Sequence, residues 1–207
     1  MITFNQFWIY QGYQNLPYNS YTVKYVGGFY YFSADNQFYK TYSNAVVINQ
    51  YLNNGAVYRQ IAYDSVSSKF YVTSYGFFRI DVIDSSCSLL QSISIGNRPY
   101  GIAIYNGIIY AGIASSNQVA VIQNGWVSNY FTISQCSTIQ NTMDSITVDS
   151  FGYLAFSCTK NNLIVIYDWN GNYMNKSVST LNTPYISAID SNGRFVIMAY
   201  SSLDIYY

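Results

Sequence analysis

The sequence contains no histidine, and all nine of its acidic residues are aspartates. Without an imidazole it can hold no Ser-His-Asp triad, no Cys-His pair and no histidine-ligated metal. Its three cysteines, Cys87, Cys136 and Cys158, lie far apart and form no C-x-x-C motif, so a zinc site has no ligand set. We therefore expect no metal site and no cofactor. One disulfide can form among three cysteines, but three free thiols are the favoured interpretation.

Charge and long apolar runs are also scarce. Only 9% of the residues are charged, and nine scattered Lys and Arg balance the nine Asp. No basic stripe could follow a phosphate backbone, so nucleic acid is not an expected partner. No apolar run reaches the roughly 18 residues that span a bilayer, so we expect no membrane insertion. The start, MITFNQFWIYQ, lacks the basic and long apolar regions of a secretory signal.

What the chain has instead is an internal repeat in a 207-residue sequence that is half apolar and contains 25 tyrosines. Each repeat joins two short apolar strands through a tight turn of Asp, Asn, Gly or Ser, the residues that such turns favour. Repeats of roughly 40–50 residues with four short strands are typical of β-propeller blades. The repeats begin at Tyr21, Tyr58, Tyr100, Met143 and Pro184.

Further strands complete each repeat. Third strands are predicted at 79–84, 118–123 and 163–168, and more polar fourth strands at 90–95 and 174–179. A polar fourth strand suits the outer edge of a blade, which faces solvent. No stretch has sustained helical periodicity, so we expect little or no helix.

The two ends of the chain predict how the ring closes. Only three strands follow Pro184, and one extra strand-like run occupies residues 3–11. We predict that this run supplies the outer strand of the last blade, a 3+1 closure that removes open sheet edges. The expected architecture is all-β, a single five-bladed β-propeller with blades at about 17–57, 58–99, 100–142, 143–183, and 184–207 plus 1–11.

One repeat carries the clearest motif, with the entry Arg98-Pro99-Tyr100-Gly101-Ile102-Ala103 and the later strands Ile109-Tyr110-Ala111 and Val119-Ala120-Val121-Ile122. This pattern resembles the NHL and YVTN families of β-propellers. The resemblance implies the propeller fold, although those families usually have six or seven blades. They include binding modules, lyases and scaffolds, so the resemblance selects no function.

Aspartates are the first candidates for catalysis, because several five-bladed propellers are glycosidases that use two carboxyl groups about 5–10 Å apart. Asp64, Asp149 and Asp190 occupy equivalent hairpin turns, where an Asx turn that holds the hairpin is the favoured interpretation. Asp81 and Asp204 lie inside third strands, and each is expected to bind a backbone or hydroxyl group. No residue is therefore assigned as catalytic.

Tyrosines at the entries of the first strands are the stronger candidates for binding. A collar of tyrosines around one mouth of the channel could stack on sugar rings or bind a protein partner, although packing between blades is the favoured alternative. Asp144 lies in the loop that enters the Met143 repeat and is a further candidate on the same face. The candidate face comprises Tyr18, Tyr58, Tyr100, Tyr185 and Asp144, with Tyr21 beside them.

A glycosylation motif is also present, because Asn175-Lys176-Ser177 matches the acceptor sequence for N-linked glycans. It lies on a predicted outer strand, where a glycan could be accommodated.

Three classes of function fit these observations. The favoured class is a non-enzymatic structural or interaction protein, a virion or cell-surface component that assembles with other protein chains. The alternative is a lectin-like module that binds glycans, and a glycan-active hydrolase is the least favoured. The composition, rich in Tyr, Ser and Asn and poor in charge, resembles surface and virion proteins of thermoacidophilic archaea and their viruses. Because few groups titrate, we expect the fold to resist acid. The expected location is a virion or extracellular surface, with the cytoplasm as the other option.

Overall fold

The computed structural model describes residues 2–4, 10–13, 20–44, 46–114, 116–136, 143–180, 184–189, 195–199 and 202–206. For residues 2–4, 10–13, 20, 144, 185–188, 197–199 and 202–206 it describes the backbone alone. Within these ranges the elements are β-strands, apart from one 3-10 turn at Thr159–Asn161. No helix in the described part of the chain is long and apolar enough to cross a membrane. The prediction of an all-β chain with little helix is therefore confirmed.

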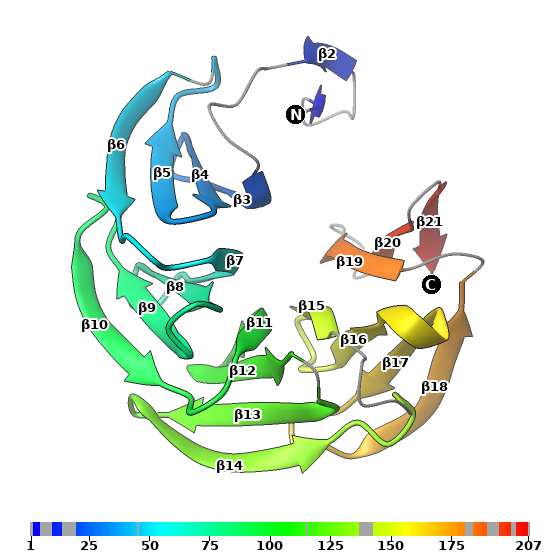
Figure 1. Ribbon diagram of the computed structural model, residues 1–207. Helices are drawn as coiled ribbons and strands as arrows, with labels where there is room; N and C mark the ends of the chain where they lie inside the picture. The colour runs from blue at the N-terminus through cyan, green and yellow to red at the C-terminus, as the bar shows by residue number, and fades with distance from the viewer. Residues whose placement is uncertain are drawn as a thin grey trace.

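Four antiparallel sheets have four strands each, and Figure 1 shows them side by side around a common centre, with their first strands innermost. The predicted third and fourth strands are confirmed within one or two residues. The four sheets are β3 (Ser20–Val26), β4 (Phe29–Ala34), β5 (Gln37–Thr41) and β6 (Val47–Leu52); β7 (Tyr58–Asp64), β8 (Lys69–Ser74), β9 (Arg79–Ile83) and β10 (Leu89–Ser94); β11 (Pro99–Tyr105), β12 (Ile108–Ile113), β13 (Gln118–Gln123) and β14 (Trp126–Thr132); and β15 (Met143–Val148), β16 (Leu154–Cys158), β17 (Leu163–Tyr167) and β18 (Tyr173–Ser179).

The two ends of the chain differ from the prediction. A three-stranded sheet contains β19 (Pro184–Ile189), β20 (Phe195–Ala199) and β21 (Ser202–Tyr206), and among the described strands β21 pairs with β20 alone. The N-terminal run is not one continuous strand, because β1 (Ile2–Phe4) pairs with β2 (Tyr10–Tyr13) as a separate hairpin. Folding back on itself satisfies the backbone groups of this segment locally. Closure by residues 3–11 and a count of five blades are therefore not confirmed.

The hydrophobic core lies between neighbouring sheets. Tyr31 and Phe38 of the first four-stranded sheet pack against Phe70 of the second, with ring centroids 4.2 Å apart for Tyr31 and Phe70. Tyr110 and Phe156 occupy the corresponding space between the third and fourth sheets. Each sheet thus covers the apolar face of the next, which is why a single four-stranded sheet of this sequence could not be stable alone. The outer strands β6, β10, β14 and β18 are the most exposed, as predicted.

Two kinds of turn fix the hairpins. Asn106 and Gly107 both have positive φ, as the predicted tight turn requires. Asp149 Oδ1 accepts hydrogen bonds from the amides of Phe151 and Tyr153 at 2.9 and 2.8 Å. Asp64 likewise accepts the amide of Val66 at 3.0 Å, so both predicted Asx turns are confirmed. Asp190 lies outside the described residues.

The cysteines differ from the favoured interpretation of three free thiols. Cys136 and Cys158 form a disulfide across 22 positions of sequence, and Cys87 is free and buried. Cys136 follows the last strand of the third sheet, whereas Cys158 ends the second strand of the fourth. Their proximity therefore depends on how neighbouring sheets pack, which the sequence spacing does not show.

Candidate functional site

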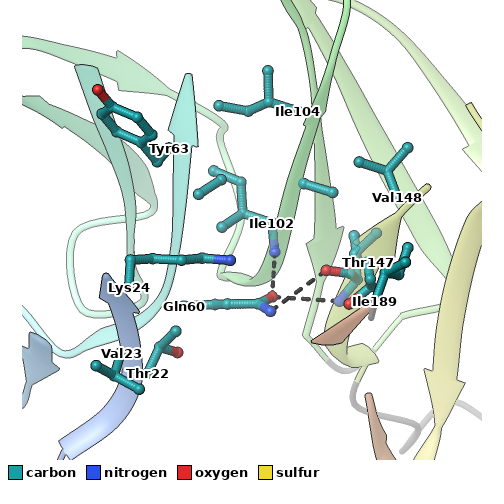
Figure 2. Close-up of a pocket in the computed structure, with 13 residues that line it drawn as sticks. Thr22, Val23, Lys24, Gln60, Tyr63, Ile102, Ile104, Thr147, Val148 and Ile189 are labelled. Atoms are coloured by element: carbon teal, nitrogen blue, oxygen red, sulfur yellow. Dashed lines mark hydrogen bonds between the residues drawn. The ribbon is translucent and has the colours of Figure 1, made fainter. Parts of the chain in front are cut away.

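A cavity of about 340 Å³ lies at the centre of the molecule, where the first strands of the sheets face one another. Its lining comes from β3, β7, β11, β15 and β19, and aliphatic side chains such as Ile102, Ile104 and Val148 form much of the wall (Figure 2). Pockets of a few hundred Å³ with a small number of polar groups are typical of small-molecule sites. This central cavity is therefore the first candidate site.

Gln60 joins three sheets across the cavity (Figure 2). Its Oε1 accepts hydrogen bonds from the amides of Ile102 at 2.6 Å and Ile146 at 3.3 Å, and its Nε2 donates to Ser145 Oγ at 3.1 Å. These amides lie where β11 and β15 depart from regular register. Such bulges leave backbone groups without a ladder partner, so the Gln60 side chain satisfies groups that the sheets leave unpaired.

Lys24 is the one charged side chain among the residues that line the cavity. In Figure 2 it extends from β3 across the cavity toward Gln60 and Ile102. The strand registers place Lys24 level with Ala62, Ala103 and Thr147 of the following first strands. Because these three side chains are small, they leave the space that the lysine occupies. Burial lowers the pKa of Lys24 below its ordinary value.

A second candidate lies at the entry end of the first strands, and we term it the arginine–tyrosine cluster. The Arg59 guanidinium carbon lies 4.2, 5.6 and 5.0 Å from the ring centroids of Tyr21, Tyr75 and Tyr100. Arg98 lies 5.0 Å from the Tyr75 ring and donates to its hydroxyl at 3.1 Å. Tyr21 is 45% exposed. The cluster therefore spans three sheets and presents aromatic rings and guanidinium groups together.

Neither arginine of this cluster is neutralised by a carboxylate that the structure describes. The one ion pair among the described residues joins Arg79 and Asp81. Arg59 Nε is buried without a hydrogen-bond partner in the described chain. The Tyr21 hydroxyl donates to Asp35 at 3.2 Å, which places one acid at the rim. The cluster is therefore positive, and Arg98 is its exposed arginine.

The opposite end carries the hairpins that follow the first strands, because successive strands of an antiparallel sheet reverse direction. Here Asp64 and Asp149 are half-buried, while Val66 and Phe151 are 94% and 74% exposed. Trp169, 44% exposed, lies beside Gly152 of the same region. We term this region the acidic hairpin end. It combines carboxylates with exposed apolar side chains.

Tyr58 belongs neither to the arginine–tyrosine cluster nor to the acidic hairpin end. It is fully buried, and its hydroxyl donates to Asp81 at 2.6 Å. Asp81 also accepts from Ser92 Oγ at 2.7 Å and Asn53 Nδ2 at 3.2 Å, and Arg79 Nε lies 2.8 Å away. Burial, followed by the nearby Asp81 carboxylate, raises the pKa of Tyr58 far above its ordinary value. The expectation that Asp81 binds a hydroxyl group is confirmed.

The remaining candidates from the sequence are placed only in part. Tyr100 is half-buried in the arginine–tyrosine cluster. Tyr18 lies outside the described residues, and for Asp144 and Tyr185 the structure describes the backbone in β15 and β19 but not the side chains. Asn175 is exposed on the outer strand β18, and its φ is positive. No three His, Cys, Asp or Glu residues gather as potential metal ligands in the described ranges.

Comparison with solved structures identifies the architecture. A streptogramin B lyase aligns with a TM-score of 0.72 and 14% identity, over 90% of this chain and 68% of that chain. A virginiamycin B lyase from Staphylococcus aureus gives the same values. A glutaminyl cyclase from Myxococcus xanthus aligns with a TM-score of 0.66 and 9% identity, over 93% of this chain and 95% of that chain. The fold is a β-propeller. No protein-family model and no curated protein matches the propeller's sequence.

The comparison corrects one expectation from the sequence. We expected a protein that is not an enzyme, but the similar propellers are named as lyases and a cyclase, and this contradicts the expectation. At 14% identity or less, this structural similarity shows the fold and does not show a particular activity.

Sequence reasoning missed Lys24, Gln60 and Arg59, which the structure places at the two candidate sites. One signal was available for Lys24, because it is a lone charged residue in a first strand whose neighbours are Val23 and Tyr25. Nothing in the sequence marks Gln60 or Arg59, whose positions depend on the register of β7.

Proposed function

We propose that this propeller is a self-assembling subunit, in which the arginine–tyrosine cluster of one copy packs on the acidic hairpin end of the next. The observation that supports this most directly is the complementarity of the two ends. Arg59 and Arg98 have no described carboxylate partner at one end, and Asp64 and Asp149 lie at the other. A contact between two different surfaces of the same chain builds a ring or an open stack.

The residue types at the two ends favour a protein interface. Arginine and tyrosine are the residues that most often contribute large binding energies, and they do so around aromatic anchors that exclude water. Phe151 and Trp169 supply exposed apolar surface on the acidic hairpin end. The net charge of the chain is zero, so long-range repulsion between copies is small.

The test uses two variants that each block one end. Arg98→Gln/Phe78→Asn changes the exposed Arg98 of the cluster and the exposed Phe78, whose ring centroid lies 5.6 Å from the Arg98 guanidinium carbon. Val66→Lys/Phe151→Lys places positive charge on the hairpin end. The mass of the parent protein in solution should rise with concentration and fall with added salt. Each variant alone should stay monomeric, while a 1:1 mixture should form dimers and nothing larger. Lys176→Gln on an outer strand is the control and should assemble like the parent.

Two results would contradict the assembly. A parent protein that is monomeric at every concentration would do so, as would variants that assemble like the parent. A monomer that binds hyaluronan, and loses this binding in the Arg98→Gln/Phe78→Asn variant, would favour the carbohydrate-binding alternative.

We keep the closed five-bladed ring as a hypothesis. The three-stranded sheet β19–β21 lacks a fourth strand among the described residues, and an N-terminal strand could supply one. A chain without residues 1–11 should then melt at a lower temperature than the full chain, and equal melting temperatures would argue against the closure.

We also keep two hypotheses that rest on the sequence alone. Membership of the NHL or YVTN families rests on the motif around Gly101. A virion or cell-surface location rests on composition, and immunogold labelling of intact particles or cells with an antibody to the chain would test it.

A further inference from the structure

We propose that Lys24 is a carbonyl-reactive amine that binds a small aldehyde or ketone in the central cavity as an imine. This inference concerns a different site from the assembly proposed above and does not depend on it. The cavity of about 340 Å³ holds the Lys24 side chain together with apolar wall residues, as Figure 2 shows. A half-buried lysine beside apolar wall residues is an arrangement that proteins use for amine nucleophiles.

The Lys24 amine has no partner in the described chain. No described residue forms a hydrogen bond or an ion pair with its Nζ. Gln60, the polar side chain that it approaches in Figure 2, already uses Oε1 for two backbone amides and Nε2 for Ser145. A carbonyl oxygen has two lone pairs, so Gln60 has no acceptor capacity left for an ammonium group.

Lys40 shows the contrast with a structural lysine. Its Nζ donates to the carbonyl oxygen of Ser85 at 3.1 Å and lies 4.2 Å from the Phe29 ring centroid. These contacts stabilise the charged form of the Lys40 amine. Lys24 has neither kind of contact among the described residues, so its position in the cavity is not explained by a stabilising interaction.

The surroundings of Lys24 favour the neutral, nucleophilic form of the amine. Burial lowers the pKa of Lys24, and no carboxylate lines the cavity in the described chain. Tyr63 of β7 lines the cavity, and Tyr31 of β4 lies opposite Lys24 in the strand register. Burial and nearby Cys87 raise the pKa of Tyr31, so near neutral pH it carries no negative charge that would stabilise the ammonium form of Lys24.

The chemistry needs no additional reactant. The neutral Nζ attacks the carbonyl carbon, and the resulting carbinolamine loses its oxygen as water. In sum, a lysine ammonium and a carbonyl compound give a protonated imine and one molecule of water, so charge and atoms balance. Ile102, Ile104 and Val148 form part of the surrounding wall, which favours a short aliphatic or aromatic group on the carbonyl.

The experiment treats the full chain with butanal and sodium cyanoborohydride near neutral pH and locates the alkylated lysines by peptide mass spectrometry. Lys24 should be labelled faster than the exposed Lys176 in the same molecule, since a lowered pKa leaves a larger fraction of the amine in its neutral form. Lys24→Arg keeps a long basic side chain but cannot form an imine, so it should lose the fast labelling and keep the slow labelling.

Labelling at Lys24 that is no faster than at Lys176 would overturn the proposal. Fast labelling that persists in Lys24→Arg would also overturn it, because another amine would then be responsible. The comparison within the parent chain remains decisive even if the variant does not fold. Neither result depends on whether the chain assembles.

Discussion

The hydroxyl of Tyr58 should stabilise the fold far more than an ordinary buried tyrosine hydroxyl. It donates to the Asp81 carboxylate at 2.6 Å, and both residues are fully buried. A hydrogen bond to a charged group contributes about 1.5–3 kcal/mol, against roughly 1 kcal/mol for a neutral pair. Tyr58→Phe should therefore lower the free energy of unfolding by about 2 kcal/mol, which corresponds to roughly 4–8 °C in the midpoint for a chain of this size.

Tyr110 provides a matched control within the same molecule. It is also fully buried, but its hydroxyl donates to a neutral acceptor, the Trp169 carbonyl oxygen, at 2.7 Å. Urea unfolding followed by circular dichroism should show that Tyr110→Phe costs about half as much as Tyr58→Phe. In an Asp81→Asn background the cost of Tyr58→Phe should fall to the level of the control. Equal costs in the parent background would refute the reasoning.

Three further outcomes follow from individual contacts. Gly101→Ala should lower stability by about 1–3 kcal/mol, measurable as urea unfolding, because its Cβ would lie 2.9 Å from the Met143 carbonyl oxygen. Replacing Cys136 and Cys158 by Ala should cost about 3 kcal/mol in the same assay, as expected for a cross-link over 22 positions. Burial would raise the pKa of Asp84, but hydrogen bonds from Ser86 and Ser88 outweigh it and hold this pKa below 3.8. The stability that Asp84 contributes is complete above that value and is lost as the pH falls below it, so Asp84→Asn should melt with less dependence on pH between 7 and 2 than the parent.

The strand pattern was predictable because it depends on neighbouring residues in the sequence. Alternating apolar residues and turns such as Asn106-Gly107 need no distant partner to be recognised. The N-terminal hairpin was not predictable in the same way, since residues 3–11 read equally well as one strand. The disulfide between Cys136 and Cys158 depends on two sheets being neighbours, which no local pattern encodes.

The candidate face was harder to predict because the first hairpin turns differ in length. If the repeats are aligned on these turns, Tyr58 matches Tyr100. The turn between β7 and β8 is longer than the turn between β11 and β12, however, so the alignment is displaced by one residue. The ladders show that Tyr58 faces Ser74 at the end of β8, as Pro99 faces Ile113 at the end of β12. Arg59 is thus the structural counterpart of Tyr100. A slip of one residue moves a side chain to another face, which is why Tyr58 is buried and Arg59 joins the cluster.

The Gln60 bridge has a consequence for how the propeller unfolds. In a stack where each sheet touches only its neighbours, one sheet can open while the sheet two places away stays intact. The Gln60 side chain from β7 accepts hydrogen bonds from an amide of β11 and an amide of β15 at once. Opening of the sheet that contains β7 therefore releases a bond in both of the other sheets. Amide hydrogen exchange at Ile102 and Ile146 in the parent protein should therefore be slowed by similar factors relative to the unfolded chain. In Gln60→Ala both amides should exchange faster together, as members of one cooperative unit rather than two.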